Sequence, residues 1–203
     1  MNAPTLHPRA ARSAKVERRT SETSIELKLV LDGTGQTNIE SGIGFLDHML
    51  TAMARHASFD LTLHCEGDLE VDDHHTAEDC ALALGQALDQ ALGDRRGITR
   101  FAHAFAPLDE ALARVVVDLS GRPAAVVNLG LTREFLGELA TENIGHVFTS
   151  LAMASRMALH VDVLRGENDH HRAEAAFKAA ALALRQAVMR DGSDQIPSTK
   201  GVL

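Results

Sequence analysis

The sequence contains no tryptophan and no tyrosine, and only two of its 203 residues are cysteine. Without tryptophan and tyrosine, the protein has few side chains on which nucleic-acid bases could stack. Cys65 and Cys80 form no CxxC pair and are too few for a disulfide framework, so we interpret both as small buried residues in a reducing compartment. No stretch approaches the roughly 18 uninterrupted apolar residues of a membrane span, and the N-terminus lacks a signal-like apolar run. These absences favour a cytoplasmic protein.

Basic residues are fewer than acidic ones, which gives the chain a formal net charge of −8. This argues against a general binder of polyanions, although a local basic pocket for one phosphate group is compatible with it. Histidine, by contrast, is abundant, with eleven copies. A chain of this length can bury the core of one large domain or of two small ones.

Patterns of period two and of helical period follow one another along the chain, which indicates an α/β protein. Residues 1–15 show no period and are expected to be a flexible tail, with the fold beginning near Thr23. A short strand is expected just before Gly42. Further strands are expected at residues 24–31, 59–65, 114–119 and 124–131, and helices at 45–56 and 77–92.

An internal repeat divides the chain in two. A shift of 96 residues places Asp73-His74-His75 on Asp169-His170-His171 and Glu78 on Glu174, while His48 matches His146 at a shift of 98. We therefore expect half-repeats at residues 16–96 and 97–192 and a tail at 193–203. The predicted fold is an internally duplicated α/β structure in which two mixed four-stranded sheets pack against a layer of four helices.

The repeated motif has the spacing of a metal site. Residues four apart lie on one face of a helix, so His74 can share an ion with Glu78, and His170 can share one with Glu174. Adjacent residues point about 100° apart, so the second histidine of each pair should serve a different ion. Symmetric pairing of the halves predicts two sites: His48, His75, His170 and Glu174, and His146, His171, His74 and Glu78.

Three imidazoles and one carboxylate leave open positions on a six-coordinate ion, which catalysis requires. These ligand types indicate a divalent transition metal without selecting one. The HHxxE order differs from the zincin motif HExxH, in which the glutamate lies between the histidines. His64 and His160 also repeat, but they lie in strand-like runs, where a structural role and an orienting role are equally open.

Four ordered segments, at residues 44–50, 73–79, 166–174 and 197–203, resemble those of imidazoleglycerol-phosphate dehydratases. The resemblance covers residues 16–203 and implies a fold like that of the ribosomal protein S5 domain 2. It implies a monofunctional enzyme for the sixth step of histidine biosynthesis, with two Mn²⁺ ions per active site. It also implies an assembly of 24 subunits in which neighbours complete each other's sites.

The resemblance further assigns roles to individual residues. All eight ligands named above correspond to the family's metal ligands. Glu22 resembles the family's substrate-contacting glutamate, and His56 is expected to approach the substrate. The residues that resemble its phosphate-contacting groups are Arg100, Arg122, Lys178, Ser198 and Lys200. Guanidinium and ammonium groups suit a phosphate dianion, although without the resemblance Arg100 and Arg122 would be read as surface charges.

The implied reaction converts D-erythro-1-(imidazol-4-yl)glycerol 3-phosphate to 3-(imidazol-4-yl)-2-oxopropyl phosphate and water. Hydroxide leaves the carbon attached to the imidazole, and a proton leaves the next carbon, which no carbonyl acidifies. Our hypothesis makes Glu22 the acid/base group, with metal-bound water or hydroxide as the alternative base. The competing interpretations are a binuclear metal hydrolase of phosphate esters and a non-enzymatic protein that stores metal or uses it structurally.

Overall fold

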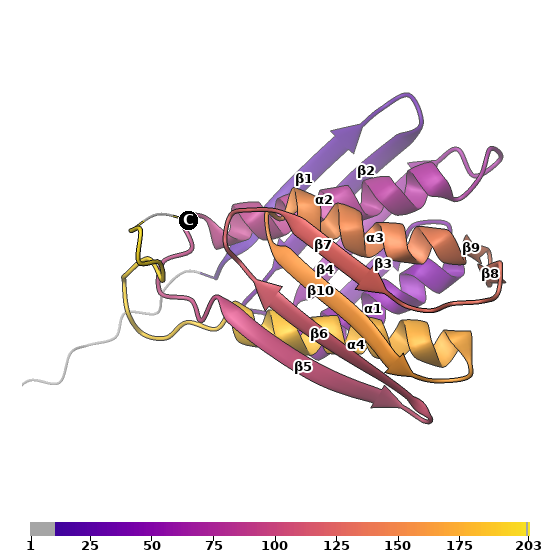
Figure 1. Ribbon diagram of the computed structural model, residues 1–203. Coiled ribbons are helices and arrows are strands. Elements are labelled where there is room, and N and C mark those ends of the chain that lie inside the picture. Colours follow the sequence, from indigo (N-terminus) through magenta and orange to yellow (C-terminus); the bar gives the residue numbers. More distant parts are fainter. Residues whose placement is uncertain (1–10, 202) are drawn as a thin grey trace, which may run out of the picture.

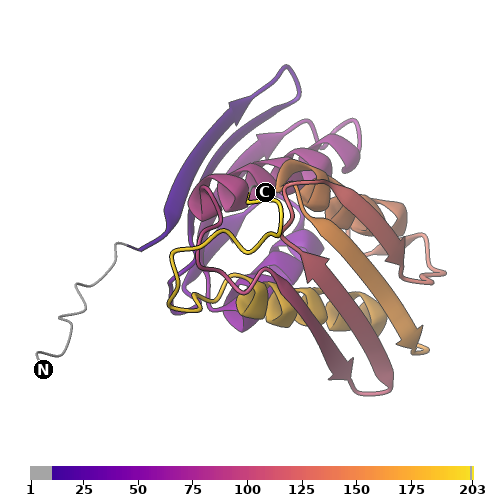
Figure 2. The same ribbon diagram turned by 60° about the vertical axis from the view of Figure 1, so that its left-hand side comes forward.

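The computed structural model describes residues 11–201 and residue 203. Its four long helices form a layer that lies between two four-stranded sheets, as Figures 1 and 2 show from two sides. The predicted arrangement of two sheets around a helix layer is thereby confirmed. None of the described helices is both long enough and apolar enough to cross a membrane.

The first half contributes β1 (Ser13–Arg19), β2 (Thr23–Val30), β3 (Thr37–Glu40), α1 (Gly44–Ala57), β4 (Asp60–Gly67) and α2 (His74–Leu92). Its strands are ordered β1-β2-β4-β3. The pairs β1–β2 and β2–β4 are antiparallel, while β3 runs parallel to β4, which makes the sheet mixed as expected.

The second half contributes β5 (Phe101–Leu108), β6 (Ala111–Asp118), β7 (Ala124–Asn128), α3 (Thr141–Ala154), β10 (Ala158–Arg165) and α4 (Asp169–Ala187). Its strand order, β5-β6-β10-β7, repeats the topology of the first sheet, including the one parallel pair. A small hairpin of β8 (Phe135–Leu136) and β9 (Leu139–Ala140) precedes α3. The duplication read from the sequence is therefore a duplication of fold.

Helices pair across the two halves: α1 packs against α4, and α2 packs against α3. Small residues allow this close approach. Along α4, Ala176, Ala179, Ala180 and Ala183 are all fully buried, and at Gly85 of α2 a side-chain Cβ would come within 2.8 Å of the Leu151 carbonyl oxygen of α3. Each helix pair thus joins one helix from each half into a common core.

The predicted flexible tail is wrong for residues 13–15, because β1 begins at Ser13 and pairs with β2 along its whole length, from Ser13↔Val30 to Arg19↔Ser24. Only Val16 of this edge strand is buried, so its apolar pattern is too weak to predict a strand. Arg12 also belongs to the folded body, since its Nη2 lies 2.6 Å from Asp32 Oδ1. The rest of the predicted tail, residues 1–10, lies outside the described residues.

All four helices begin at the same end of the molecule. A pocket at that end is lined by Ile43, Asp73 and Ala140, which directly precede α1, α2 and α3, while α1 and α4 meet through the rings of Phe45 and His170, 5.2 Å apart. The C-terminal residues fold back over the opposite end, where the helices finish (Figure 2). The two ends of the helix layer carry different sets of the predicted site residues.

Candidate metal centres

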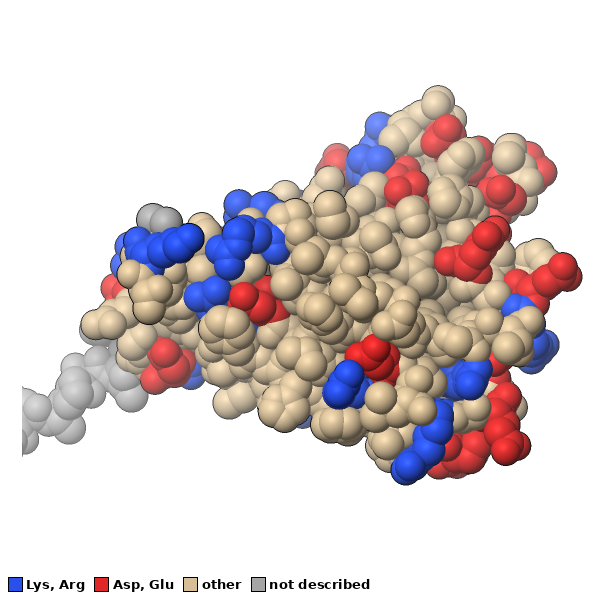
Figure 3. All heavy atoms as spheres, viewed as in Figure 1, with Lys and Arg blue, Asp and Glu red and all other residues tan. Residues whose placement is uncertain are grey.

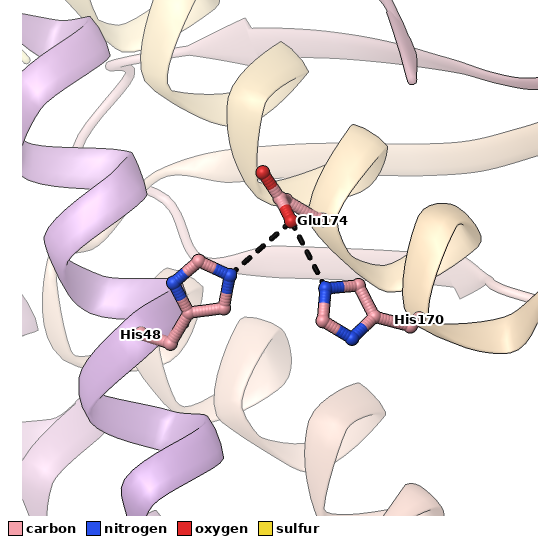
Figure 4. Close-up of side chains that lie close together, drawn as sticks. All are labelled: His48, His170 and Glu174. Carbon is pink, nitrogen blue, oxygen red and sulfur yellow. Dashed lines mark hydrogen bonds and ion pairs between the residues drawn. The ribbon is translucent and has the colours of Figure 1, made fainter. Parts of the chain in front are cut away.

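The first cluster joins α1 to α4. Figure 4 shows His48 and His170 with their rings turned toward Glu174. The Nε2 atoms of His48 and His170 lie 3.2 and 3.1 Å from the same carboxylate oxygen, Glu174 Oε2. His170 and Glu174 are one helical turn apart on α4, as the i,i+4 spacing predicted, and His48 reaches them from the other half of the chain.

A second cluster joins α2 to α3 in the same way. His146 Nε2 lies 3.1 Å from Glu78 Oε1, and His74 Nε2 lies 3.6 Å from Glu78 Oε2. The rings of His74 and His146 are stacked with their centroids 4.9 Å apart. In both clusters one helix supplies a histidine and a glutamate, and a helix of the other half supplies a second histidine.

The chemistry of both clusters fits a metal ion. In each, the three ligand atoms lie within 4.8 Å of one another. Among the described residues, the buried His146 Nε2 atom has no hydrogen-bond partner with acceptable geometry, although Glu78 is close. An imidazole nitrogen left in this state is suited to bind a cation, and two imidazoles with one carboxylate suit a divalent transition metal.

The structure brings together three of the four residues predicted for each site. His75 and His171, the second histidine of each motif, belong to neither cluster among the described residues. His75 Nδ1 lies 3.0 Å from Asp68 Oδ2, and His171 Nδ1 lies 2.7 Å from Glu110 Oε2. The expectation that adjacent histidines turn in different directions therefore agrees with the geometry.

These contacts leave the second ring nitrogen of both histidines facing another carboxylate. His75 Nε2 lies 3.8 Å from Glu22 Oε1, and His171 Nε2 lies 3.8 Å from Asp109 Oδ2. The hydrogen bonds that the imidazole rings donate to Asp68 and Glu110 raise the pKa of His75 and of His171, respectively. The backbone N–H of Asn168 and then His171 lower the pKa of Glu110 to about 2.

The side chains that orient these histidines were not predicted from the sequence. Asp68 and Glu110 hold Nδ1 of the second histidines, and Asn143 Oδ1 lies 2.9 Å from His74 Nδ1. Such partners fix the ring so that Nε2 faces the site. No spacing in the sequence points to them, because they come from a strand end, a hairpin turn and a different helix.

Lys178 lies beside the first cluster, one turn beyond Glu174, as predicted. Its Nζ atom is 2.6 Å from Glu174 Oε1, and its side chain is only 20% exposed. Burial raises the pKa of the Glu174 carboxyl, but the hydrogen bond and charge of Lys178 and the hydrogen bonds of His170 and His48 together hold the pKa below its ordinary value. The cluster therefore keeps its carboxylate ionised.

The other predicted phosphate contacts lie at the far end of the helices. Arg100 is 9% exposed; its guanidinium donates to Asp118 and, from Nη1, to the Pro197 carbonyl oxygen at 2.6 Å. This bond holds the start of the segment that carries Ser198 and Lys200. At its end, Leu203 packs against Gly121, next to the exposed Arg122.

His56 is likewise exposed in the last turn of α1, roughly 12 Å along the helix from His48. A 19-residue helix such as α2 is about 28 Å long. Within one chain, the metal clusters and the tail residues therefore do not meet.

Comparison with known proteins identifies the family. A family model described as imidazoleglycerol-phosphate dehydratase matches residues 41–184. A relative of that name from Phaffia rhodozyma is 58% identical over 95% of this chain and 96% of its own length, and one from Roseiflexus sp. is 56% identical over 97% and 100%. A 60% identical relative from Phytophthora nicotianae covers 99% of this chain, which spans 45% of that longer protein.

Solved structures agree with these sequence matches. The imidazoleglycerol-phosphate dehydratase of Staphylococcus aureus superposes with a TM-score of 0.80 at 35% identity, covering 88% of this chain and 99% of its own. That of Pyrococcus furiosus, solved in complex with (S)-C348, gives 0.80 at 37% identity, covering 93% and 100%. With this fold, these paired histidine–glutamate clusters and these matches, the chain belongs to the imidazoleglycerol-phosphate dehydratase family.

Proposed function

We propose that this dehydratase holds two Mn²⁺ ions per active site and uses them to remove water from imidazoleglycerol phosphate. The single observation that carries the proposal is the twofold construction of one ligand set, two imidazoles and a carboxylate, by helices from opposite halves. A purely structural helix gains nothing from paired imidazoles at its start. We also propose a cytoplasmic location, which the free, buried cysteines favour.

The distance between the two ends of the helices supports an active site shared between copies of the chain. The C-terminal segment, which carries Ser198 and Lys200, lies at the end where the helices finish (Figure 2), and its last residue, Leu203, packs against Gly121, the neighbour of Arg122. A substrate with an imidazole at one end and a phosphate at the other is far shorter than the roughly 28 Å of α2. In the proposed assembly, one copy supplies the metal cluster with Lys178, and another supplies the tail that binds the phosphate. His75 and His171 complete the ligand sets of neighbouring copies.

The outer faces of the two sheets support self-association. On the first sheet, one row of paired positions across the strands contains Glu17, Glu26, His64 and Glu40. The matching row of the second sheet contains His103, Val116, His160 and Val126, and Phe101 (58% exposed) and Phe105 (51%) lie on the same face. Figure 3 shows this face over β5, β6, β10 and β7 with few charged side chains.

The outer face of the first sheet is charged, whereas the outer face of the second sheet is largely apolar. Large exposed apolar patches mark interaction sites, so we expect the outer face of the second sheet to be covered in the assembled protein. The covering partner we propose is further copies of this chain in a homo-oligomer of 24 subunits.

In this arrangement the residues of the chain have distinct tasks. Lys178 and the tail residues Ser198 and Lys200 bind and orient the phosphate, which keeps the imidazole in register with the metal clusters. Glu22 takes the proton from the carbon next to the departing hydroxyl group and can return a proton later. When bound, the metal ions act as Lewis acids that stabilise negative charge on the imidazole ring.

A product assay with metal-depleted enzyme tests the proposal. Adding Mn²⁺ should restore formation of the keto phosphate, with no inorganic phosphate released, and Mg²⁺, which imidazole binds poorly, should restore less. Release of inorganic phosphate from the same substrate would instead favour a phosphate-ester hydrolase. Full turnover in the metal-depleted enzyme would refute a catalytic role for the ions.

A further inference from the structure

Asp79 is a buried carboxylate on α2, one residue beyond Glu78. Its side chain is 8% exposed, and both oxygens are occupied. Arg18 of β1 donates from Nε and Nη2 to Oδ1 at 3.0 and 2.7 Å, and the Thr23 hydroxyl donates to Oδ2 at 2.5 Å. A buried charge is tolerated when it is paired and hydrogen-bonded in this way. Asp79 therefore ties helix α2 to both strands of the β1–β2 hairpin.

The bond to Thr23 fixes the direction of a chain of hydroxyl groups in the hairpin turn. A carboxylate can only accept, so the Thr23 hydroxyl must donate to Asp79, and its oxygen accepts from the Thr20 hydroxyl 3.2 Å away. The Thr20 oxygen in turn accepts the backbone N–H groups of Glu22 and Thr23, at 3.1 and 2.9 Å. The carboxylate beneath the turn thus orders the hydroxyl chain, which holds the turn together with two backbone hydrogen bonds, from Thr20 N–H to the Thr23 carbonyl and from Asp68 N–H to the Glu22 carbonyl.

This turn presents Glu22 to His75. His75 and Asp79 are four residues apart on α2 and therefore lie on the same face of the helix, one turn from each other. Asp79 anchors the base of the turn, and the Glu22 carboxylate at its tip lies 3.8 Å from His75 Nε2. Glu22 is otherwise a 45% exposed side chain, so its position depends on the backbone that carries it.

The second half of the chain provides an internal comparison. The residue equivalent to Asp79 is Ala175, and the equivalent hairpin β5–β6 has no buried carboxylate beneath it among the described residues. Only Asp109 and Glu110 separate the last paired residues of β5 and β6, whereas four residues separate Arg19 from Ser24. A two-residue turn is fixed by its own backbone, whereas the longer turn has the contacts of Thr23 and Arg18 with Asp79 in addition to its backbone hydrogen bonds.

We infer that Asp79 is a positioning residue, which holds the β1–β2 turn through Thr23 and Arg18 so that the Glu22 carboxylate faces His75 and the reacting substrate. The inference rests on the proposed catalytic role of Glu22. It assigns to Asp79 an orienting task distinct from that of its neighbour Glu78, which faces the metal cluster.

The first test compares Asp79→Asn with a matched control, Asp89→Asn, in the assembled, Mn²⁺-loaded enzyme. Asp89 lies on the same helix and also pairs with two arginines, Arg95 and Arg156, but at the other end of the molecule. An asparagine at position 79 offers one oxygen for two donors, so the hydroxyl chain must rearrange. We expect kcat to fall about 10–100-fold with KM and bound metal unchanged, and the control to retain wild-type kcat.

A second test uses Thr23, which is 4% exposed. Thr23→Val keeps the shape and removes the hydroxyl group, so it should lower kcat as Asp79→Asn does. Thr23→Ser keeps the hydroxyl group and should retain most of the activity. A loss that followed side-chain volume, with both variants equally impaired, would overturn the inference.

A double variant that combines Asp79→Asn with Glu22→Gln tests whether Asp79 affects kcat only through the position of Glu22. If Asp79 acts through Glu22, the double variant should be no slower than Glu22→Gln alone. A further 10–100-fold loss in the double variant, or full activity of Asp79→Asn, would overturn the inference. If Glu22→Gln itself keeps full activity, the proposed role of Glu22 fails, and a crystal structure of Asp79→Asn decides on positioning alone. A Glu22–His75 distance unchanged from 3.8 Å would then refute it.

Discussion

Replacing Glu174 by glutamine should weaken metal binding at one cluster and leave metal binding at the other cluster unchanged. The substitution keeps the side-chain size but removes the anionic oxygen that faces both His48 and His170, at 3.2 and 3.1 Å. Residues that merely orient ligands change metal affinity by about 10–100-fold, so the loss of a direct anionic ligand should exceed about 100-fold, or about 2.7 kcal/mol. Glu78 faces the other cluster, and Glu78→Gln should therefore weaken only that cluster.

The same substitution also has an effect without metal, which must be measured separately. Lys178 loses the negative charge of its partner at 2.6 Å, while its side chain stays only 20% exposed. Leaving a partly buried charge unpaired should lower the free energy of unfolding of the metal-free protein by about 1–3 kcal/mol, measured by denaturant titration. Lys178→Met in combination with Glu174→Gln should recover part of this loss, because the unpaired charge is then absent.

Anomalous scattering from crystals grown at one limiting Mn²⁺ concentration measures the occupancy of each cluster. We expect Glu174→Gln to empty the site of His48 and His170 first, and Glu78→Gln to empty the site of His74 and His146 first. Selective loss at the opposite site in both variants would refute the assignment of each carboxylate to the ion of the first histidine in its own motif.

Three further predictions follow from other parts of the molecule. Chelation should lower the sedimentation coefficient, and Mn²⁺ should restore it, because metal ligands are shared between copies; an unchanged coefficient in both conditions would contradict the shared site. Deleting residues 193–203 should lower kcat/KM by at least about 100-fold through the lost phosphate contacts, whereas the metal content of each cluster, measured by elemental analysis, should stay the same. The side-chain hydrogen bond from Arg12 holds the pKa of Asp32 below its ordinary value, so the stability contributed by this pair is complete above the unfolded-state pKa of about 3.9 and is lost as the pH falls through the lower folded-state pKa. Asp32→Asn should therefore flatten the pH dependence of the unfolding free energy below about pH 4. An unaltered pH dependence in denaturant titrations would show that the Arg12–Asp32 pair contributes nothing to the unfolding free energy.

The sequence predicted those parts of the fold and the site that depend on local periodicity. His170 and Glu174 share a cluster because four residues bring a helix back to the same face, and the repeat then implies the same for His74 and Glu78. The partner histidines, His48 and His146, could be found because the duplication required an equivalent in each half.

Features set by tertiary contacts were not predictable in this way. The strand β5 has its alanines, Ala102, Ala104 and Ala106, on the buried face and Phe101 and Phe105 on the exposed face. This inverts the usual relation between side-chain size and burial, so no strand was predicted there. The orienting contact between Asp68 and His75 likewise depends on where β4 ends in space relative to α2.

Pairing of α1 with α4 and of α2 with α3 has a consequence for the origin of the molecule. Neither half contains a complete cluster, because each needs a histidine from the other half. A chain the length of one half could nevertheless build both clusters by associating with an identical copy, since the two halves share one topology. The present chain has the architecture of such a symmetric dimer joined into a single polypeptide. Separately expressed halves should accordingly associate in solution, and metal ions should favour the complex of the two halves.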